Sequence, residues 1–438
     1  MSEKWARMLL SAYRLAGSAA FPLVGPYVVW RATKGKEDRN RRRERSGLAG
    51  RPRPEGPVIW AHAASVGETV AIIPLIDSIL DYGVNVVLTT GTVTSAQVAD
   101  DRLGDRVIHQ FVPLDLKPAI SRFLNHWQPD LAIMAESEIW PMTILELGLR
   151  RVPQVLVNGR LSDRSFSMWR RWPDLSEALF ENMAHVVAQS EVDAERFQAL
   201  GARPVTVSGN LKVDTNPPPV NEHDLHALRR QIGLRPSWAA VSTHEGEETM
   251  AAEVHAMLRP HHLGLLTIIV PRHPDRALAL AVEFAAMGLK VVLRSSGERV
   301  RSDTDILLGD TIGEMGLYLR LADIAFVGRS LTMEGGQNPL EPAMLETAVL
   351  SGPNVQNFRD AYERLVEAGA VRIVENRDEL AGEVNFLLGD GRARREMIAA
   401  GVATVEEMRG ALDKTLRALE PYVRPLIVKS RLRHTGTH

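Results

Sequence analysis

The sequence predicts a two-domain α/β protein: two successive parallel sheets with a cleft between them, preceded by an N-terminal membrane anchor. Its 438 residues are too many for one ordinary hydrophobic core. Short apolar runs alternate with helical patterns in both halves, which is typical of parallel sheets covered by helices. Asn216-Pro217-Pro218-Pro219 interrupts the alternation and indicates a linker between the two series.

The predicted strands are short runs rich in aliphatic and β-branched residues. In the first half they are residues 57–61, 84–89, 107–112, 131–134, 155–157, 186–188 and 205–207. In the second half they are residues 239–242, 265–270, 290–293, 306–308, 324–327 and 348–350. Helical spacing follows the first strand at 69–80 and closes the chain at 393–419.

Composition indicates a folded globular protein, with 45% hydrophobic and 24% charged residues. The absence of cysteine excludes disulfides and thiolate chemistry, and it fits a reducing compartment. The net charge of −2 is unevenly spread, because residues 31–53 hold ten Lys or Arg and three Asp or Glu. A basic neck therefore precedes an acidic body.

Residues 8–30 form an apolar segment with one charge, Arg14. About 20 apolar residues can span a bilayer, but Pro22 and Pro26 leave both a kinked span and an interfacial anchor open. The basic cluster at 39–45 argues against a cleaved export signal, because positive residues stay cytoplasmic. We expect it to hold the body of the protein on an anionic cytoplasmic leaflet, the alternative being a solvated arm that binds nucleic acid.

Glu68 lies in the first turn of the helix that follows the first strand, at the sheet edge where α/β folds bind ligands. Its spacing from Ser65 also fits a capping box. Gly67 is costly inside a helix and suggests that something approaches the backbone closely. A carboxylate in that position could act as a general base.

Two further groups follow predicted strands of the first half. Glu136 and Glu138 come after residues 131–134. Either could act as an acid or base or stabilise charge in a reaction, and the alternative is that they cap the exposed end of the strand. Lys212 follows residues 205–207 and offers a cation to an anionic substrate, unless it is a surface turn lysine.

In the second half, Arg272 and His273 end a strand in a turn stiffened by two prolines, which suits a phosphate contact. Thr311 to Glu314 and Asn338 to Glu341 each have the spacing of a capped helix start. Gly335 and Gly336 precede the helix start at Asn338 and leave its backbone N–H groups accessible, as in an anion-binding site.

Several common motifs are absent from the chain. It has no GxGxxG after a strand and no GxxxxGK[ST], which disfavours a dinucleotide dehydrogenase or a P-loop kinase. It also lacks HExxH, and its histidines are scattered, so no metal site is indicated.

Taken together, seven motifs spread in order over residues 57–360 resemble the 3-deoxy-D-manno-octulosonic acid (Kdo) transferases of lipid A synthesis. The motifs are Ala64-Ser65-Val66-Gly67-Glu68, Pro113-Leu114-Asp115, Glu136-Ser137-Glu138-Ile139-Trp140-Pro141, Val157-Asn158-Gly159-Arg160-Leu161-Ser162, Gly209-Asn210-Leu211-Lys212, Val270-Pro271-Arg272-His273-Pro274 and Gly335-Gly336-Gln337-Asn338-Pro339-Leu340-Glu341-Pro342. Each motif is short, but the ordered set is specific.

The resemblance implies a GT-B glycosyltransferase whose two Rossmann-like domains bind acceptor and donor. With it the chain divides into a membrane anchor at 1–33, a basic juxtamembrane neck at 34–56, an acceptor domain at 57–215, a donor domain at 216–410, and a C-terminal helix with a basic tail at 411–438.

By the family pattern Glu68 is the general base, and Lys212 with one acid of the Glu136/Glu138 pair, preferably Glu136, stabilises the transition state. No metal or other cofactor is implied, and the donor substrate is CMP-Kdo. The residues expected to hold its CMP part are Arg272, His273, Gly313, Glu314, Met315, Asn338, Pro339, Leu340 and Glu341. Gln337 and Arg329 depart from the family, which more often has histidine and glycine at these two positions.

The implied reaction is an inverting transfer of Kdo to the lipid A precursor lipid IVA, by a protein of the inner membrane whose soluble domains face the cytoplasm. Nucleic acid is not an expected partner. One alternative is another GT-B transferase or epimerase with a different donor, such as a UDP-sugar, because fold does not fix donor. A non-catalytic membrane-bound scaffold would be marked by loss of Glu68, Lys212 or Arg272, and all three are present.

Overall fold

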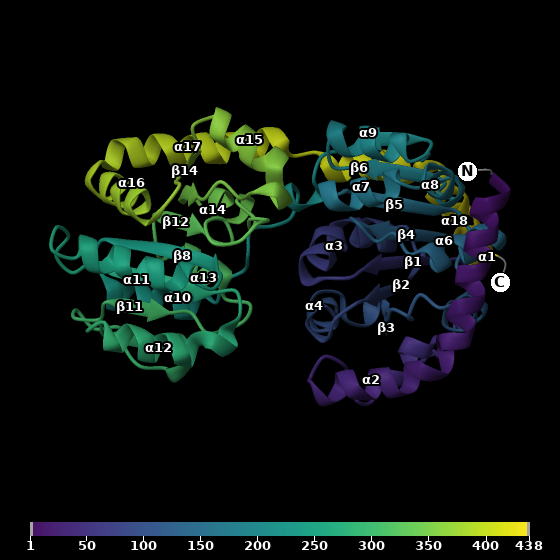
Figure 1. Ribbon diagram of the computed structural model, residues 1–438, viewed down its shortest axis with the longest axis horizontal. Coiled ribbons are helices and arrows are strands. Elements are labelled where there is room, and N and C mark those ends of the chain that lie inside the picture. Colours follow the sequence, from purple (N-terminus) through teal and green to yellow (C-terminus); the bar gives the residue numbers. More distant parts are fainter. Residues whose placement is uncertain (1–2, 436–438) are drawn as a thin grey trace. The chain divides into compact units, whose positions relative to one another are not determined.

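The computed structural model describes residues 3–435, with side chains placed for residues 8–432. The chain divides into two compact units. Unit 1 comprises the residues up to 215 and those from 409 onward, and unit 2 comprises residues 216–408. Each unit is built on a parallel sheet with helices packed on it, which confirms the predicted pair of parallel α/β sheets (Figure 1).

The sheet of unit 1 has seven strands in the described part of the chain, in the order β3-β2-β1-β4-β5-β6-β7. Neighbouring strands are parallel throughout. The strands are β1 (Val58–Ala63), β2 (Asn85–Thr90), β3 (Ile108–Phe111), β4 (Leu131–Ala135), β5 (Gln154–Gly159), β6 (His185–Ala188) and β7 (Val205–Val207).

The helices of unit 1 come from both ends of the chain and from the crossovers. They are α1 (Glu3–Ala20), α2 (Val24–Thr33), α3 (Val66–Asp81), α4 (Val93–Leu103), α5 (Lys117–Trp127), α6 (Pro141–Leu149), α7 (Asp163–Arg170), α8 (Pro173–Phe180), α9 (Glu191–Ala199) and α18 (Ala411–Thr435). Short 3-10 helices are η1 (Phe21–Leu23), η2 (Arg42–Ser46) and η4 (Leu211–Val213).

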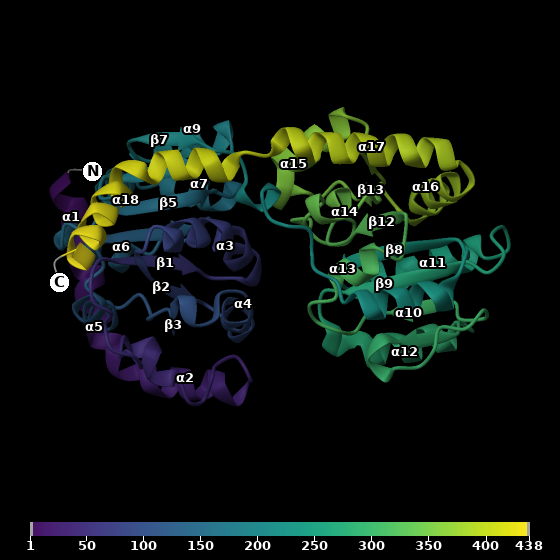
Figure 2. The same cartoon turned by 180° about the vertical axis from the view of Figure 1, so that it is seen from behind.

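Both faces of this sheet are buried, because every residue of β1 is covered. Ile59 packs in a cluster with α3 and with Leu419 and Val423 of α18. Trp60 faces the opposite cluster, which includes Phe123 of α5. Figure 2 shows α18, in yellow, lying across unit 1, so the end of the chain completes the core of its first half.

Unit 2 repeats this architecture, with strand order β10-β11-β9-β8-β12-β13-β14. The strands are β8 (Ser237–Thr243), β9 (Leu266–Pro271), β10 (Val291–Leu293), β11 (Ile306–Leu308), β12 (Ile324–Val327), β13 (Ala348–Ser351) and β14 (Val371–Ile373). The helices are α10 (Glu222–Ile232), α11 (Glu247–Leu258), α12 (Ala277–Ala286), α13 (Met315–Leu319), α14 (Leu340–Met344), α15 (Arg359–Glu367), α16 (Arg377–Gly389) and α17 (Gly391–Met408).

Two features differ from the predicted elements. Strand β14 was not expected, since Arg372 at its centre interrupts the apolar run. The helical stretch predicted at 393–419 is two helices, α17 and α18, separated at Gly410, whose positive φ of 98° ends helical geometry.

The apolar segment at 8–30 is divided among α1, η1 and α2. Among residues 3–435, no helix is both long enough and apolar enough to cross a bilayer. The charge within the segment is paired with the body of unit 1, because Arg14 on α1 lies 3.1 Å from Glu146 on α6.

Part of the basic neck is folded into unit 1. Arg45 is buried, and its guanidinium donates to Glu37 and to the carbonyls of Gly91 and Val112. Arg41 donates to Glu44, which in turn accepts the backbone N–H of Phe111 on the edge strand β3 at 2.7 Å. The neck thus supplies structural ion pairs as well as exposed cations.

Candidate active site

In unit 1 the strand order reverses between β1 and β4, so the loops leaving their carboxyl ends border one crevice. Glu68 follows β1, whereas Glu136 and Glu138 follow β4. The structure therefore brings these sequence-predicted acids to one place, and Lys212 of η4 joins them.

Glu68 combines a capping contact with a half-buried position. Ser65 is the N-cap of α3, and its hydroxyl oxygen accepts the backbone N–H of Glu68 at 3.3 Å. The Glu68 carboxylate accepts the N–H of Ala64 and the hydroxyl of Ser65, both at 2.8 Å. Its pKa is raised by burial and by the charges of Glu136 and Glu138. A carboxylate with a raised pKa at a sheet edge is suited to accept a proton.

Gly67 precedes this carboxylate in the first turn of α3. A Cβ built on it meets no backbone, and its nearest neighbour is Cε of Lys212 at 3.9 Å, an ordinary contact. The protein itself therefore leaves room for a side chain at this position. A larger residue at position 67 would place its side chain next to Lys212.

Glu136 pairs with Lys212. The Lys212 Nζ lies 2.5 Å from Glu136 Oε1, and the Nδ2 of Asn158 donates to the same oxygen at 3.4 Å. Asn158 also accepts the backbone N–H of Leu211 at 2.9 Å, which holds η4 against the end of β5. Glu136 is 8% exposed and adopts a left-handed φ of 55°, a conformation that non-glycine residues rarely take.

Glu138 has a different set of partners. Its Oε2 lies 3.2 Å from Nε2 of the buried His62 and accepts the indole N–H of Trp140. On its other side, His62 Nδ1 lies 2.9 Å from Thr89 Oγ1. A proton placed on Nε2 of His62 lets His62 donate to Glu138, so this acid is held by two donors, His62 and Trp140.

Three contributors to this cluster were not assigned a role from sequence: His62, Asn158 and Trp140. Each belongs to a segment beside a strand's carboxyl end, and that position is the signal that could have found them. Asp115, in contrast, has a structural role, since it accepts the backbone N–H groups of Met142 and Thr143 at the start of α6. Burial raises the pKa of this carboxyl.

The corresponding crevice of unit 2 lies between β8 and β12, where that strand order reverses. Glu247, at the start of α11, accepts the backbone N–H groups of four residues on the two bordering loops. They are His244, Arg329, Ser330 and Leu331. The pattern Gly246-Glu247 repeats Gly67-Glu68 after the first strand, but a carboxylate with four donors organises the loops and is not available as a base.

Cations gather around this second crevice. Arg272 and His273 follow β9 and are exposed, and the ring of His273 lies 5.7 Å from that of His244. The pKa of His244 is lowered by burial and by nearby Arg329, although its contact with the Ser242 carbonyl opposes this. An anionic ligand at the carboxyl edge of this sheet would meet Arg272, His273 and Arg329.

The remaining predicted donor residues occupy two short segments. Glu314 follows Gly313 and is the N-cap of α13, which begins at Met315. The predicted N-cap, Thr311, is therefore three residues before the observed one, Glu314. The carboxylate of Glu314 accepts a hydrogen bond from the guanidinium of Arg294 at 2.8 Å. In the other segment, Asn338 accepts the N–H of Leu340 and donates to Glu341, and Pro339 is the N-cap of the five-residue α14.

Gly335 and Gly336 have a packing reason of their own. Both have positive φ, and a Cβ on Gly335 would lie 2.6 Å from the side-chain nitrogen of Asn357. A Cβ on Gly336 would lie 2.9 Å from Cα of Val355. The pair of glycines therefore reflects close loop packing and does not by itself indicate an anion site.

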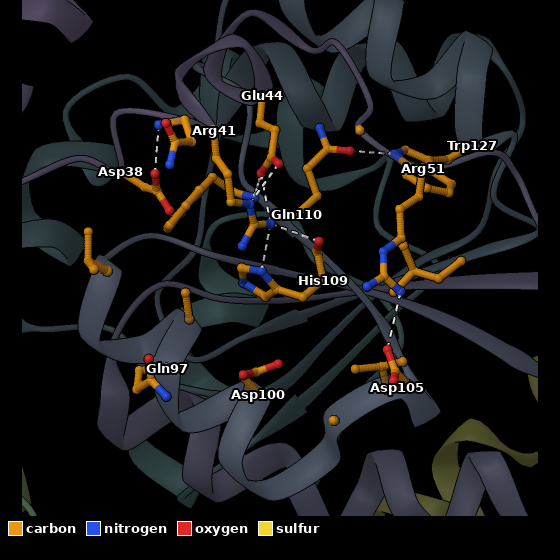
Figure 3. Close-up of a pocket in the computed structure, with 18 residues that line it drawn as sticks. Asp38, Arg41, Glu44, Arg51, Gln97, Asp100, Asp105, His109, Gln110 and Trp127 are labelled. Atoms are coloured by element: carbon orange, nitrogen blue, oxygen red, sulfur yellow. Dashed lines mark hydrogen bonds and ion pairs between the residues drawn. The ribbon is translucent and has the colours of Figure 1, made fainter.

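A cavity of about 520 Å³ lies elsewhere in unit 1, between the neck, β3 and α4 (Figure 3). Arg41 donates to both Glu44 and His109 on its wall, and the amide nitrogen of the buried Gln110 has no hydrogen-bond partner. Burial, Arg41 and Arg45 lower the pKa of His109 to about 3. None of the predicted catalytic residues lines this cavity.

Within the part of the chain that the structure describes, no three His, Cys, Asp or Glu side chains come together as metal ligands would.

Comparison with known proteins gives a consistent result. Residues 40–215 match the family model described as 3-Deoxy-D-manno-octulosonic-acid transferase (kdotransferase). A 3-deoxy-D-manno-octulosonic acid transferase of Haemophilus influenzae is 35% identical, over 92% of this chain and 96% of that protein. One of Bordetella pertussis is also 35% identical, over 85% and 89% of the two chains.

Solved structures show the same fold at low identity. The UDP-GlcNAc 2-epimerase of Neisseria meningitidis bound to UDP-GlcNAc has a TM-score of 0.58 at 12% identity, over 83% of this chain and 99% of its own. A glycosyltransferase of Rickettsia africae also has a TM-score of 0.58 at 12% identity, over 84% and 99%. At these identities the likeness concerns the GT-B-like fold alone.

Proposed function

Because the chain belongs to the 3-deoxy-D-manno-octulosonic acid transferase family, we propose that it transfers Kdo from CMP-Kdo to a hydroxyl of the lipid A precursor lipid IVA. The observation that carries the proposal is the 35% identity to such a transferase over 92% of this chain. The cluster of Glu68, Glu136 and Lys212 at the carboxyl edge of unit 1 supplies groups suited to that chemistry.

Glu68 is the proposed general base. It takes the proton of the acceptor hydroxyl as the hydroxyl oxygen forms a bond to the anomeric carbon of Kdo. The bond from that carbon to the phosphate oxygen breaks at the same time, and CMP leaves with the bonding electrons. A single displacement of this kind inverts the anomeric centre.

Lys212 and Glu136 are proposed to act electrostatically. The ammonium group of Lys212 is fixed 2.5 Å from Glu136 Oε1, so its position is set before substrate binds. A fixed cation stabilises negative charge that develops in the transition state without reorganisation. The carboxylate of Kdo and the departing phosphate are the anions that it would meet.

The donor site is proposed to lie in unit 2. Arg272 there offers positive charge to the phosphate of CMP, and the imidazole of His273 offers a hydrogen-bond donor. The segments 313–315 and 338–341 complete the set expected to hold the nucleotide. These groups give the phosphate its counter-charge from side chains, so the proposal invokes no metal or other cofactor.

We further propose that unit 1 rests on the cytoplasmic leaflet of the inner membrane. Apolar side chains on α1, η1 and α2 are exposed, namely Met8, Leu15, Leu23, Val29 and Trp30. Exposed cations of the neck follow them, namely Lys34, Lys36, Arg39, Arg42 and Arg43. An apolar face followed by basic residues is typical of an interfacial anchor on an anionic leaflet.

The test is incubation of the purified full chain with lipid IVA and CMP-Kdo generated in situ, followed by mass spectrometry of the lipid. A mass increase by whole Kdo units is expected, and Glu68→Ala should give none. Competition by CMP and by UDP separates the donors. The proposal would be overturned if UDP inhibited the reaction and CMP did not. It would also be overturned if the folded protein gave no product although the donor had been verified.

A further inference from the structure

A basic and apolar side of α7 is exposed on unit 1. Arg164 and Met168 are four residues apart and share one side of the helix, Arg171 is its C-cap, and Trp172 follows directly. Met168 is 53% exposed and Trp172 is 44% exposed, and both arginines are exposed. We call these four residues the α7 face.

The opposite side of α7 is anchored by packing. Trp169 meets the ring of Phe180 edge-on at 6.0 Å, and the guanidinium of Arg196 lies 5.5 Å from the ring of Phe166. Arg196 also bonds Asp163, the acidic residue of α7. These contacts fix the rotation of the helix, so the α7 face is held outward by the fold.

The α7 face starts from the loop that borders the carboxylate cluster. The hydroxyl of Ser137, between the two acids Glu136 and Glu138, donates to the carbonyl of Arg160 at 2.8 Å. Ser162, two residues later, is the N-cap of α7. Met168 is six residues beyond this cap, which corresponds to about 9 Å of helix at 1.5 Å per residue. Helix α8 contacts both α7 and α1 (Figure 1).

The chemistry of the α7 face matches an anionic bilayer surface. Arginines gain free energy near acidic headgroups, and tryptophan prefers the interface between headgroups and acyl chains. Methionine adapts its flexible side chain to irregular apolar surroundings. Since Asp163 is bonded to Arg196, the arginines of the α7 face give it a positive charge that such a surface would attract.

We propose that the α7 face rests on an anionic lipid bilayer, as a contact separate from α1 and α2. The contact brings the carboxylate cluster to the membrane, so a lipid acceptor can reach it without leaving the leaflet. Only this consequence depends on the proposed function; the contact itself does not.

The absence of cysteine allows a direct test on the full chain. A Met168→Cys variant is labelled with an environment-sensitive fluorophore and mixed with vesicles of equal parts phosphatidylcholine and phosphatidylglycerol. A blue shift of the emission is expected, which high salt should reduce and phosphatidylcholine alone should not produce. The matched control is Leu278→Cys on α12 of unit 2, an apolar position that is 72% exposed, whose label should stay in water.

A double variant tests the charges. Arg164→Gln with Arg171→Gln should bind these vesicles about 30-fold more weakly, because each arginine near an anionic surface contributes about 1 kcal/mol. Arg299→Gln with Arg301→Gln, two exposed arginines of unit 2, should bind as the parent chain does. Circular dichroism and melting curves establish that each variant is folded.

The proposal is overturned if the label at position 168 is unshifted while the chain sediments with vesicles, because α1 and α2 would then be the whole contact. It is equally overturned if the parent chain does not bind, or if the label shifts the same with phosphatidylcholine alone. No donor sugar is present in these measurements, so a failure of Kdo transfer would leave the readout unchanged.

Discussion

Glu68 serves two purposes at once, because its carboxylate accepts two hydrogen bonds at the start of α3 and is also the proposed base. Glu68→Gln retains an acceptor for the N–H of Ala64 but cannot take a proton. We therefore expect a loss of turnover of about 10²–10⁴-fold with little change in melting temperature.

Ser65→Ala provides the comparison, since it removes the N-cap and leaves the carboxylate. It should cost about 1 kcal/mol of stability and retain most of the turnover. Turnover by mass spectrometry and unfolding by circular dichroism measure both effects. If Glu68→Gln remained an efficient transferase, the base assignment would be wrong and the carboxylate would be a cap only.

The raised pKa of Glu68 predicts a pH dependence. Burial is the main cause, followed by the charges of Glu136 and Glu138, and Lys212 is the neighbouring cation. A base is inactive when protonated, so kcat/KM should fall as pH is lowered through this raised pKa. Glu138→Gln removes one negative charge, lowers the pKa of Glu68, and should move this acidic limb to lower pH.

The measurement is a pH profile of kcat/KM for the parent chain and for Glu138→Gln. His62→Leu is a useful companion, because it removes one donor to Glu138 and retains the acid. An acidic limb that stays in place, or moves to higher pH, in Glu138→Gln would contradict the electrostatic coupling of the two carboxylates.

At the residue scale, the sequence could predict that Glu68, Glu136, Glu138 and Lys212 gather, because each follows a strand of one predicted parallel sheet. It could not predict which acid meets Lys212. That depends on the left-handed backbone of Glu136, and on His62 and Trp140 holding Glu138 elsewhere. These are contacts between distant segments, and periodicity carries no information about them.

At the element scale, the neck closes the edge of strand β3. Glu44 is buried, accepts the N–H of Phe111 and pairs with Arg41. Glu44→Ala would leave that N–H without its partner, which should cost on the order of 2 kcal/mol of unfolding free energy.

Urea unfolding followed by circular dichroism measures this loss. Arg42→Ala is the matched control within the same 3-10 helix, because Arg42 is exposed, and its effect should stay within about 0.5 kcal/mol. Equal stabilities of the two variants would mean that the neck does not hold the sheet edge.

The strands and the neck show how much structure hydrophobic and charge patterns can predict. Thirteen of the strands in the described chain were predictable because each is an apolar run between turns, whereas β14 has Arg372 at its centre. The neck was predictable as a basic segment but not as a partly buried one. Counting charges cannot reveal that Arg45 bonds Glu37 and two carbonyls inside unit 1.

At the scale of the whole molecule, the two units share an architecture and differ in chemistry. Both place Gly-Glu after the first strand, beside the point where strand order reverses. Glu68 has a raised pKa and accepts two hydrogen bonds, whereas Glu247 accepts four from backbone N–H groups. Acid/base groups thus gather in unit 1, and unit 2 offers the guanidinium of Arg272 and the imidazole of His273.

This division predicts that CMP alone binds unit 2. Ligand that binds only the folded state stabilises it, by about 2.7 kcal/mol at a hundredfold excess over Kd. Hydrogen exchange of the full chain, followed by mass spectrometry, should therefore show added protection in unit 2, above all at the ends of β8, β9 and β12. Arg272→Gln should abolish it, and Arg299→Gln, an exposed arginine far along the chain from β9, should leave it intact. Protection confined to the loops around Glu68 would instead place the nucleotide in unit 1 and reverse the assignment of donor and acceptor to the two units.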